Sequence, residues 1–351
     1  MRFKKTKRAV GWRQQLGVAA LAVGLVAMAA CGGGDSDTST TGATSGDTTG
    51  AGAGGSTPAK EYKVKVGTLR QPHLFAPAFY PQFLPDNVTV ETVLFANSTE
   101  IKTAVVTGSV DFAVTGITAA LEGAAQDEPF RVLASAADGA SAIVAKKDSG
   151  IATVADLRDK KIGYVAGSAQ DILLRLTLQD AGMDANKDVE LVKVGFSDMA
   201  NALDRGDIDA FSGAETGPSD ALVRGIAQLV VHPYDTKMQK INIVFGTSQK
   251  TIDEDPELVK IMVATHAKAT DYMAAHPDEW GQAVVKAYSF PPEALTLAIQ
   301  NISLRWAIDD AYIGQAKVLG EQLEALKQIK KQPDYEAFFD TTFVADLPKG
   351  G

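Results

Sequence analysis

The feature that most constrains the fold is the segment of residues 151–183, where a short helix, a buried strand and a longer helix follow one another. Thr153 and Asp156 have the spacing of a capping box, which satisfies free N–H groups at a helix start. Residues 162–165 are β-branched and aromatic, as strands prefer. Gly167 allows a tight turn, and the apolar positions of residues 172–178 form one helix face. A strand that leads through a turn into a helix indicates an α/β fold.

The turn between this strand and the longer helix is a candidate for ligand binding. Ser168 can cap the helix, and Asp171, three residues later, completes a second capping box. Free N–H groups at a helix start attract anions and hydrogen-bond acceptors. The Asp171 carboxylate weakens that attraction, and an ordinary capped helix explains the same residues. Both interpretations stay open.

Strands and helices alternate through most of the chain, which predicts βαβ units and a mostly parallel sheet. Strands are expected at or within residues 62–67, 88–95, 108–113, 130–134, 141–146, 189–194, 206–211, 226–231 and 241–245. Segments 108–120 and 206–221 share an order of glycine, acidic turn, short strand and small-residue turn. This order indicates one unit used twice, unless two common turns are alike by chance.

Two regions are expected to be helical. Residues 74–83 form a helix interrupted by Pro77 and Pro81. Beyond Pro256 the pattern is helical at residues 257–275, 277–287, 292–300 and 309–329, and no further strand is expected. Five aromatic residues are expected in the core: Phe75, Phe79, Tyr80, Phe211 and Trp306.

The first thirty residues have the composition of an export signal, with six basic residues and no acidic one. Residues 17–30 are an apolar run of about 21 Å as a helix, shorter than the roughly 30 Å hydrocarbon core, which favours a signal peptide over a membrane anchor. Small residues before Cys31, the single cysteine, resemble the processing site of bacterial lipoproteins, with Met28 where leucine is usual. The resemblance implies lipid on Cys31. A secretory signal with an incidental cysteine is the alternative.

Residues 31–60 are almost entirely Gly, Ser, Thr, Ala and Asp, a composition that predicts a disordered tether. Without the first thirty residues, 28 basic residues face 43 acidic ones. Such acidity argues against nucleic acid as a partner and favours a soluble monomer whose copies repel one another.

Several kinds of site are not expected from the sequence. The four histidines, His73, His232, His266 and His276, are dispersed, so neither a metal site nor a cofactor is predicted. No P-loop, dinucleotide-binding or nucleophile-elbow motif occurs. His266 and His276 are expected to be exposed, because the helical segment around them is polar.

Three segments resemble substrate-binding proteins of ABC importers: residues 145–174 (AKKDSGIATVADLRDKKIGYVAGSAQDILL), 108–116 (GSVDFAVTG) and 206–211 (GDIDAF). The most similar branch is the nitrate/sulfonate/taurine-binding group, which has relatives that bind thiamine-pyrimidine precursors. The resemblance covers residues 62–225 well and the last third loosely. It implies an α/β, two-lobed periplasmic-binding-protein type II fold with two crossover hinge strands and a helical C-terminal cover.

The same resemblance divides the chain and implies its site. Lobe 1 is expected at residues 61–146 and 247–351 and lobe 2 at residues 147–246, with crossovers near Lys146 and Phe245. The ligand is expected at turns that follow strands in both lobes. Carried over by position, the ligand-binding residues are Arg70, Gln71, His73, Asn97, Ser98, Thr99, Gly116, Ile117, Thr118, Ser168, Ala169, Gln170, Glu215 and Thr216.

Two departures from the group bear on the ligand. Sulfonate and nitrate binders commonly have a tryptophan before a proline where residues 213–218 read GAETGP. Carboxylates of Asp171 and Glu215 near the cleft disfavour a small oxyanion by Coulomb repulsion. Simpler roles remain open: Ser98 and Thr99 as helix caps, and Glu215 as a charge that closes the lobes.

The implied function is capture of a sulfonate-, taurine- or nitrate-like solute by an extracytoplasmic, lipid-anchored protein that delivers it to an ABC permease and catalyses no reaction. An amine-bearing or heteroaromatic solute, such as a thiamine pyrimidine precursor, is the alternative ligand. Two other classes stay open. One is a surface lipoprotein without a permease, and the other is an enzyme with His73 and Glu215 as acid and base.

Overall fold

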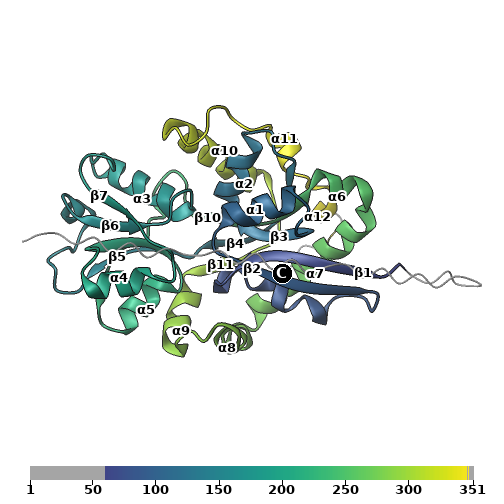
Figure 1. Ribbon diagram of the computed structural model, residues 1–351, viewed down its shortest axis with the longest axis horizontal. Coiled ribbons are helices and arrows are strands. Elements are labelled where there is room, and N and C mark those ends of the chain that lie inside the picture. The colour runs from purple at the N-terminus through teal and green to yellow at the C-terminus, as the bar shows by residue number, and fades with distance from the viewer. Residues whose placement is uncertain (1–59, 346, 348–351) are drawn as a thin grey trace, which may run out of the picture. The chain divides into compact units, whose positions relative to one another are not determined.

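A computed structural model describes residues 60–345 and 347. The predicted signal peptide (1–30), the lipidation site Cys31 and the tether up to residue 59 lie outside the described residues. Two β-sheets, each covered by helices, make up the described part (Figure 1). Among its helices, none combines the length and the apolar character needed to cross a membrane.

The first sheet has the strand order β11-β4-β10-β3-β1-β2. Its strands are β1 (Tyr62–Leu69), β2 (Val88–Phe95), β3 (Phe112–Gly116), β4 (Phe130–Gly139), β10 (Ile241–Ser248) and β11 (Ile302–Leu304). Strand β1 pairs in parallel with β2 and β3, whereas β10 runs antiparallel between β3 and β4. The sheet is therefore mixed and not mostly parallel as predicted.

The second sheet repeats this arrangement, with the order β7-β6-β8-β5-β9. Its strands are β5 (Ser141–Lys146), β6 (Lys161–Tyr164), β7 (Glu190–Lys193), β8 (Ala210–Ala214) and β9 (Ala227–Val231). Strand β6 pairs in parallel with β7 and β8, and β5 runs antiparallel between β8 and β9. Strands β3 and β8, which lie in the two similar segments of sequence, thus hold the same place in their sheets.

The chain passes between the sheets at residue 140 and returns within residues 232–240. This differs from the crossovers expected near Lys146 and Phe245, because β5 belongs to the second sheet and all of β10 to the first. Both strands are buried on both faces along almost their whole length, so they lack an alternating pattern that would show which sheet they join. By sheet membership, we call residues 60–139 and 241–345 the first lobe and residues 141–231 the second lobe.

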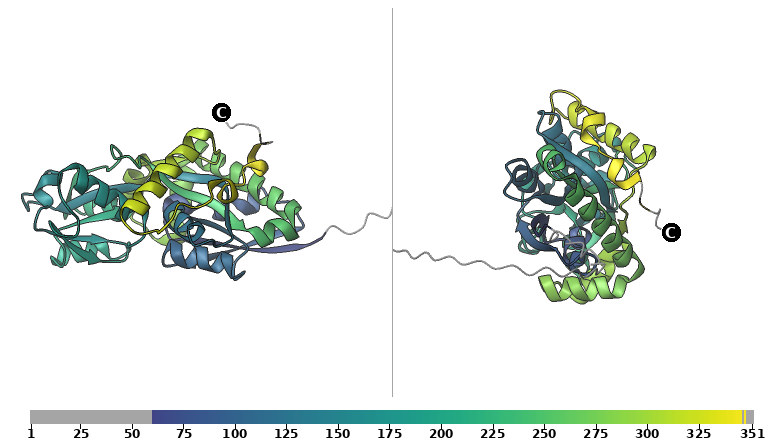
Figure 2. Two further views of the ribbon diagram at one scale, coloured as in Figure 1. Left: turned by 90° about the horizontal axis from the view of Figure 1, so that it is seen from above. Right: turned by 90° about the vertical axis from the view of Figure 1, so that its right-hand side faces the viewer.

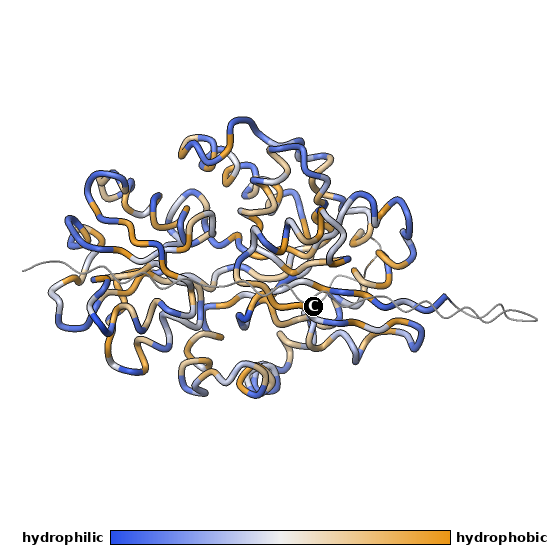
Figure 3. The backbone as a smooth tube through the Cα atoms, in the orientation of Figure 1, coloured by the Kyte–Doolittle hydropathy of each residue, from blue (hydrophilic) through white to orange (hydrophobic). Residues whose placement is uncertain are grey.

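Helices cover both sheets, and those that follow Pro256 pack around the first one (Figures 1 and 2). The first-lobe helices are α1 (Ser98–Val106), α2 (Ile117–Ala124), α6 (Gln249–Glu254), α7 (Pro256–Ala275), α8 (Pro277–Tyr288), α9 (Pro292–Gln300), α10 (Asp310–Ala325), α11 (Tyr335–Phe338) and α12 (Thr342–Ala345). The second-lobe helices are α3 (Ala169–Asp180), α4 (Met199–Arg205) and α5 (Gly217–Val223). Figure 3 shows hydrophobic strands inside and hydrophilic loops outside.

The predicted helix at residues 74–83 is wrong. Three short 3-10 turns take its place: η1 (Pro72–Leu74), η2 (Ala76–Ala78) and η3 (Tyr80–Gln82). Each turn has a proline in its first two positions. Proline fixes φ and lacks an N–H, so it starts a turn readily but cannot continue a helix.

The core of the first lobe contains an aromatic stack that includes a histidine. Phe245 on β10 lies between Phe112, with ring centroids 5.6 Å apart, and His266, at 4.6 Å. His266 is fully buried, which corrects the expected exposure: its Nε2 donates to the Ser135 carbonyl and its Nδ1 accepts from the Tyr80 hydroxyl, each at 2.8 Å. Burial lowers the pKa of His266 to about 4, so the ring is neutral.

The five aromatic residues expected in the core are all buried, which confirms that prediction. They are Phe75, Phe79, Tyr80, Phe211 and Trp306.

Candidate ligand-binding site

Two pockets lie at the junction of the lobes, where the parallel strands of both sheets end. The outer pocket has a volume of about 540 Å³ and the inner pocket about 30 Å³. Leu69, Gln71 and Phe196 line both pockets, so the two adjoin one another. Open α/β sheets bind ligands at this edge.

The inner pocket takes its walls from both lobes. From the first lobe they are Leu69, Gln71, His73, Leu74, Ser98, Gly116, Thr118, Ala119, Asn242 and Ile243. From the second lobe they are Gly167, Ser168, Ala169, Gln170, Phe196 and Ala214. Its volume holds only a water molecule or a small group of a solute, and a group placed there is in reach of both lobes at once.

The start of α3 is built as the sequence predicts, with one difference. The capping box of Thr153 and Asp156 is present before β6. Ser168 caps α3 by accepting from the Asp171 N–H at 3.2 Å. The Asp171 carboxylate, however, accepts from the Gly167 N–H at 3.1 Å, so the second capping box predicted with Ser168 is not the one formed.

Helix α3 also ties the lobes together by apolar packing. Its residues Ala169, Ile172, Leu173 and Leu176 belong to the hydrophobic cluster of the first lobe, although the helix follows a strand of the second. Leu174 and Leu178 pack within the second lobe. The inner pocket therefore lies beside a hydrophobic contact between the lobes.

Most of the predicted ligand-binding residues line one of the two pockets. Gln71, His73, Ser98, Gly116, Thr118, Ser168, Ala169 and Gln170 line the inner pocket, and Arg70, Gln71 and Thr216 line the outer one. Asn97, Thr99, Ile117 and Glu215 line neither.

The four residues outside the pockets have other surroundings. Asn97 caps α1 by accepting from the Glu100 N–H at 2.9 Å, so neither Ser98 nor Thr99 is the cap. Ile117 is buried in the core of the first lobe. Glu215 lines a separate groove behind the lobe junction.

Several pocket residues were not predicted. Phe196, Ser197 and Asp198 follow β7, and Phe290 and Pro291 connect α8 to α9. The repeat in the sequence could have predicted residues 196–198, because β7 holds the place in its sheet that β2 holds in the other. The resemblance implies ligand contacts in the turn after β2, and the repeat implies the same for the turn after β7.

Three buried polar atoms on the wall of the inner pocket have no hydrogen-bond partner among the described residues. They are Gln71 Oε1, His73 Nδ1 and Thr118 Oγ1. An unpartnered buried polar atom costs about 1–3 kcal/mol, and such atoms are few in folded proteins. A ligand group or an ordered water molecule in this pocket can supply the missing bonds.

No Asp, Glu, Lys or Arg lines the inner pocket within the described part of the chain. Burial lowers the pKa of His73 to about 3, so this ring is neutral at physiological pH. The inner wall therefore carries hydrogen-bonding groups without net charge.

The carboxylates of Asp171 and Glu215 do not line the two pockets, contrary to the expectation from the sequence. The Asp171 carboxylate is paired with the Arg175 guanidinium at 2.7 Å and does not line either pocket. Glu215 lies outside both pockets as well. Repulsion by these two carboxylates therefore does not decide the charge of the ligand.

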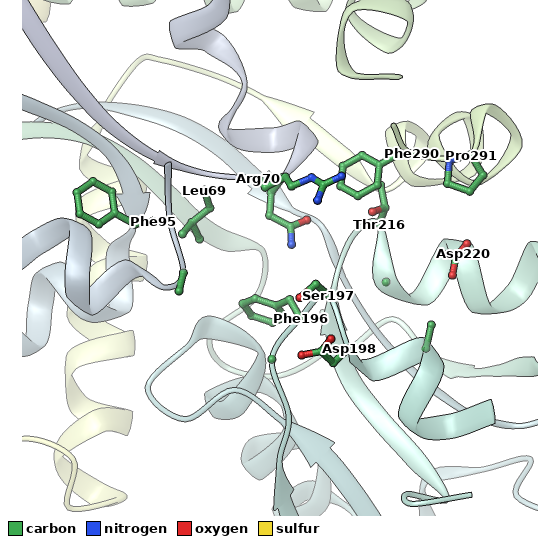
Figure 4. A pocket seen from close by; sticks show the side chains of 15 residues that line it. Leu69, Arg70, Phe95, Phe196, Ser197, Asp198, Thr216, Asp220, Phe290 and Pro291 are labelled. Carbon is green, nitrogen blue, oxygen red and sulfur yellow. The ribbon is translucent and has the colours of Figure 1, made fainter. Parts of the chain in front are cut away.

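The outer pocket is larger and carries charges (Figure 4). The Arg70 guanidinium donates to the Tyr288 carbonyl and lies 5.4 Å from the centroid of the Phe290 ring. Figure 4 shows Arg70 beside Phe290, with Phe196 and Asp198 in another part of the wall. Two carboxylates, those of Asp198 and Asp220, also line this pocket, and Asp220 pairs with Arg224 at 3.2 Å.

The arrangement does not assemble the acid–base pair of the enzyme hypothesis. His73 lines the inner pocket, whereas Glu215 lines the separate groove. In the described part of the chain, no group of three or more His, Cys, Asp or Glu side chains could hold a metal ion.

This chain is similar to several known proteins in sequence and in fold. A Haemophilus influenzae protein named for thiamine biosynthesis is 33% identical over 172 residues, which are 46% of this chain and 51% of that protein. The chain thus spans about half the length of such a relative.

Two solved structures share the fold at low identity. The alkanesulfonate-binding protein of Xanthomonas axonopodis pv. citri, bound to MOPS, has a TM-score of 0.71 at 16% identity, over 81% of this chain and 100% of that one. The periplasmic nitrate-binding protein of Synechocystis has a TM-score of 0.66 at 16% identity, over 82% and 89%. The two-lobed periplasmic-binding-protein fold predicted from the sequence is confirmed.

The sequence also matches a protein family. Residues 83–280 match the family described as "NMT1/THI5 like". Since that match covers more than half of the sequence, the chain belongs to the NMT1/THI5-like family.

Proposed function

We propose that this protein is the extracytoplasmic solute-binding component of an ABC-type importer and captures a small polar solute between its lobes. The observation that carries the proposal is the inner pocket, which both lobes line and where Gln71, His73 and Thr118 present unpartnered polar atoms. A solute that bonds to both lobes favours their closed arrangement, because bridging contacts exist only there. The names of the two structures with the same fold, one for alkanesulfonate and one for nitrate binding, support this function.

The chemistry of the inner pocket favours one ligand class. Gln71 Oε1 accepts hydrogen bonds, so a solute group with an N–H or O–H donor satisfies it. Nitrate and simple sulfonates have no donor, and the inner wall offers them no cation. These groups favour the amine-bearing or heteroaromatic alternative, such as an aminopyrimidine precursor of thiamine, over the oxyanions of the first expectation. Taurine also carries an amine, and Arg70 in the outer pocket could meet its sulfonate.

The N-terminal residues supply the location in this proposal. Lipid on Cys31 holds the protein at the outer face of the membrane, and the tether up to residue 60 gives the lobes room to meet a permease. Cells that express the full chain are expected to incorporate labelled palmitate into it, and Cys31→Ser is expected to abolish the label. Equal labelling of both chains argues against the anchor.

Solute binding is tested with the purified full chain and a defined panel. We expect calorimetric titration to detect an aminopyrimidine, with taurine weaker and nitrate absent, and mass spectrometry to find the same class of solute co-purified. Binding of nitrate without the aminopyrimidine contradicts the ligand class. The function itself is contradicted if neither the panel nor the co-purified fraction contains a bound solute.

A further inference from the structure

Behind the lobe junction, one asparagine bonds to every segment that joins the two lobes. Asn301 ends α9 and precedes β11 in the first lobe. Its backbone carbonyl accepts from the Ala140 N–H at 2.8 Å, and its side-chain Nδ2 donates to the Ser141 carbonyl at 3.1 Å. Both bonds hold the first crossing between the sheets. Gly139, with φ of +80°, lies so close that an added Cβ would be 2.6 Å from the Asn301 carbonyl oxygen.

The same side chain reaches the second crossing and the second lobe. Its Oδ1 accepts from the Tyr234 hydroxyl at 2.8 Å, and that hydroxyl accepts from the Ser141 N–H at 2.9 Å. Its Nδ2 also donates to Glu215 Oε1 at 3.1 Å. Asn301 therefore joins residues 140–141, Tyr234 and Glu215 in one network.

Glu215 depends on this network because it is only 2% exposed. Its Oε2 accepts from the Ser219 hydroxyl at 2.6 Å, and Asn301 supplies the bond to Oε1. Burial raises the pKa of Glu215, while the bonds from Ser219 and Asn301 lower it. A groove of about 400 Å³ reaches the network from outside, and its other titratable residues are His232, Tyr234 and Lys240.

We propose that Asn301 is a positioning residue for lobe closure, which holds Glu215 and both crossings in the closed arrangement without touching the solute. Glu215 and Asn301 belong to different lobes, so their bond restrains how the lobes lie relative to one another. The consequence for solute capture rests on the proposed function, but the effect on the lobes does not. In this proposal Glu215 bonds to Asn301 across the lobes and does not contact the ligand as expected from the sequence.

The test exploits the polarity of the hydrogen bond. Asn301→Asp replaces the donor with a second carboxylate facing Glu215, and two ionised carboxylates in contact repel each other. Adding Glu215→Gln restores a donor–acceptor pair at this contact with the direction reversed, while the bond from residue 301 to the Ser141 carbonyl stays lost in both variants. Spin labels at cysteines introduced for Glu91 on β2 and Lys187, both exposed, report the distance between lobes in a full chain with Cys31→Ser.

We expect Asn301→Asp at pH 8 to shift the label distances to longer values, and at pH 5 to return toward the unsubstituted chain as the pair shares a proton. The double variant, which removes the facing carboxylate, is expected to have shorter label distances than Asn301→Asp at pH 8 and the same distances at both pH values. Asn87→Asp is the control, since Asn87 Nδ2 also donates to a backbone carbonyl, that of Lys60 at 2.7 Å, but within the first lobe.

Unchanged distances in Asn301→Asp at pH 8, or a double variant that stays open, overturn the proposal. Thermal unfolding of each variant separates this role from a general loss of stability, which lowers the midpoint without moving the distances. The comparison needs no solute. If the full chain binds no solute at all, the proposed function fails while the test of Asn301 stands.

Discussion

Replacing Thr118 with valine is expected to lower the affinity for the captured solute by about tenfold or more without lowering the stability of the protein. Thr118 is 1% exposed, and its hydroxyl has no partner among the described residues. Valine keeps the shape and removes a buried polar group that the protein alone leaves unsatisfied, so the free energy of unfolding should stay constant or rise slightly. Calorimetric titration and urea unfolding measure the two quantities.

Thr270→Val is the matched control for this substitution. Thr270 is also buried, on α7, but its hydroxyl donates to the His266 carbonyl at 2.8 Å. Its replacement should cost about 1 kcal/mol of stability and leave the solute affinity unchanged. If Thr118→Val keeps full affinity, or loses stability as Thr270→Val does, the hydroxyl does not serve the ligand.

Phe245→Ala is expected to be the most destabilising substitution considered, at about 3–5 kcal/mol of the free energy of unfolding. Phe245 lies on β10 in the middle of the first sheet, fully buried between Phe112 and His266. Its removal leaves a cavity that the stacked rings and the fixed His266 cannot fill. The midpoint of thermal unfolding should fall by roughly 5–15 °C.

The control for that measurement is Leu94→Ala on β2, where the side chain is 51% exposed. A surface substitution of this kind should change stability by about 0.5 kcal/mol or less. A loss below about 1 kcal/mol in Phe245→Ala means that the stack does not hold the first sheet together.

Local signals in the sequence predicted local structure well. Gly167 and Ser168 mark the start of α3, and Thr153 with Asp156 marks the turn before β6, because capping chemistry depends only on neighbours in the chain. The resemblance of the turns after β1 and β6 to a known family then brought Gln71 and Gln170 to one pocket. These are cases where short-range pattern and fold agree.

Features that depend on distant partners could not be predicted. Strand β11 (Ile302–Leu304) has three residues, too few for a pattern, and exists because β4 offers it an edge. His266 lies on a helix with polar neighbours, and only its bonds to Tyr80 and Ser135 make burial possible. Glu215 looked like a cleft residue because it follows β8, yet its side chain bonds to Asn301 behind the junction.

The position of β10 has a consequence for synthesis of the chain. This strand fills the gap between β3 and β4, but residues 140–240 must leave the ribosome before it does. At about 5–20 residues per second, that gap stays open for roughly 5–20 s. The contiguous second lobe can form during this time, whereas the unpaired edges of β3 and β4 remain available for wrong pairing. Residues 60–139 of the nascent chain are therefore the part that needs protection from aggregation until β10 arrives.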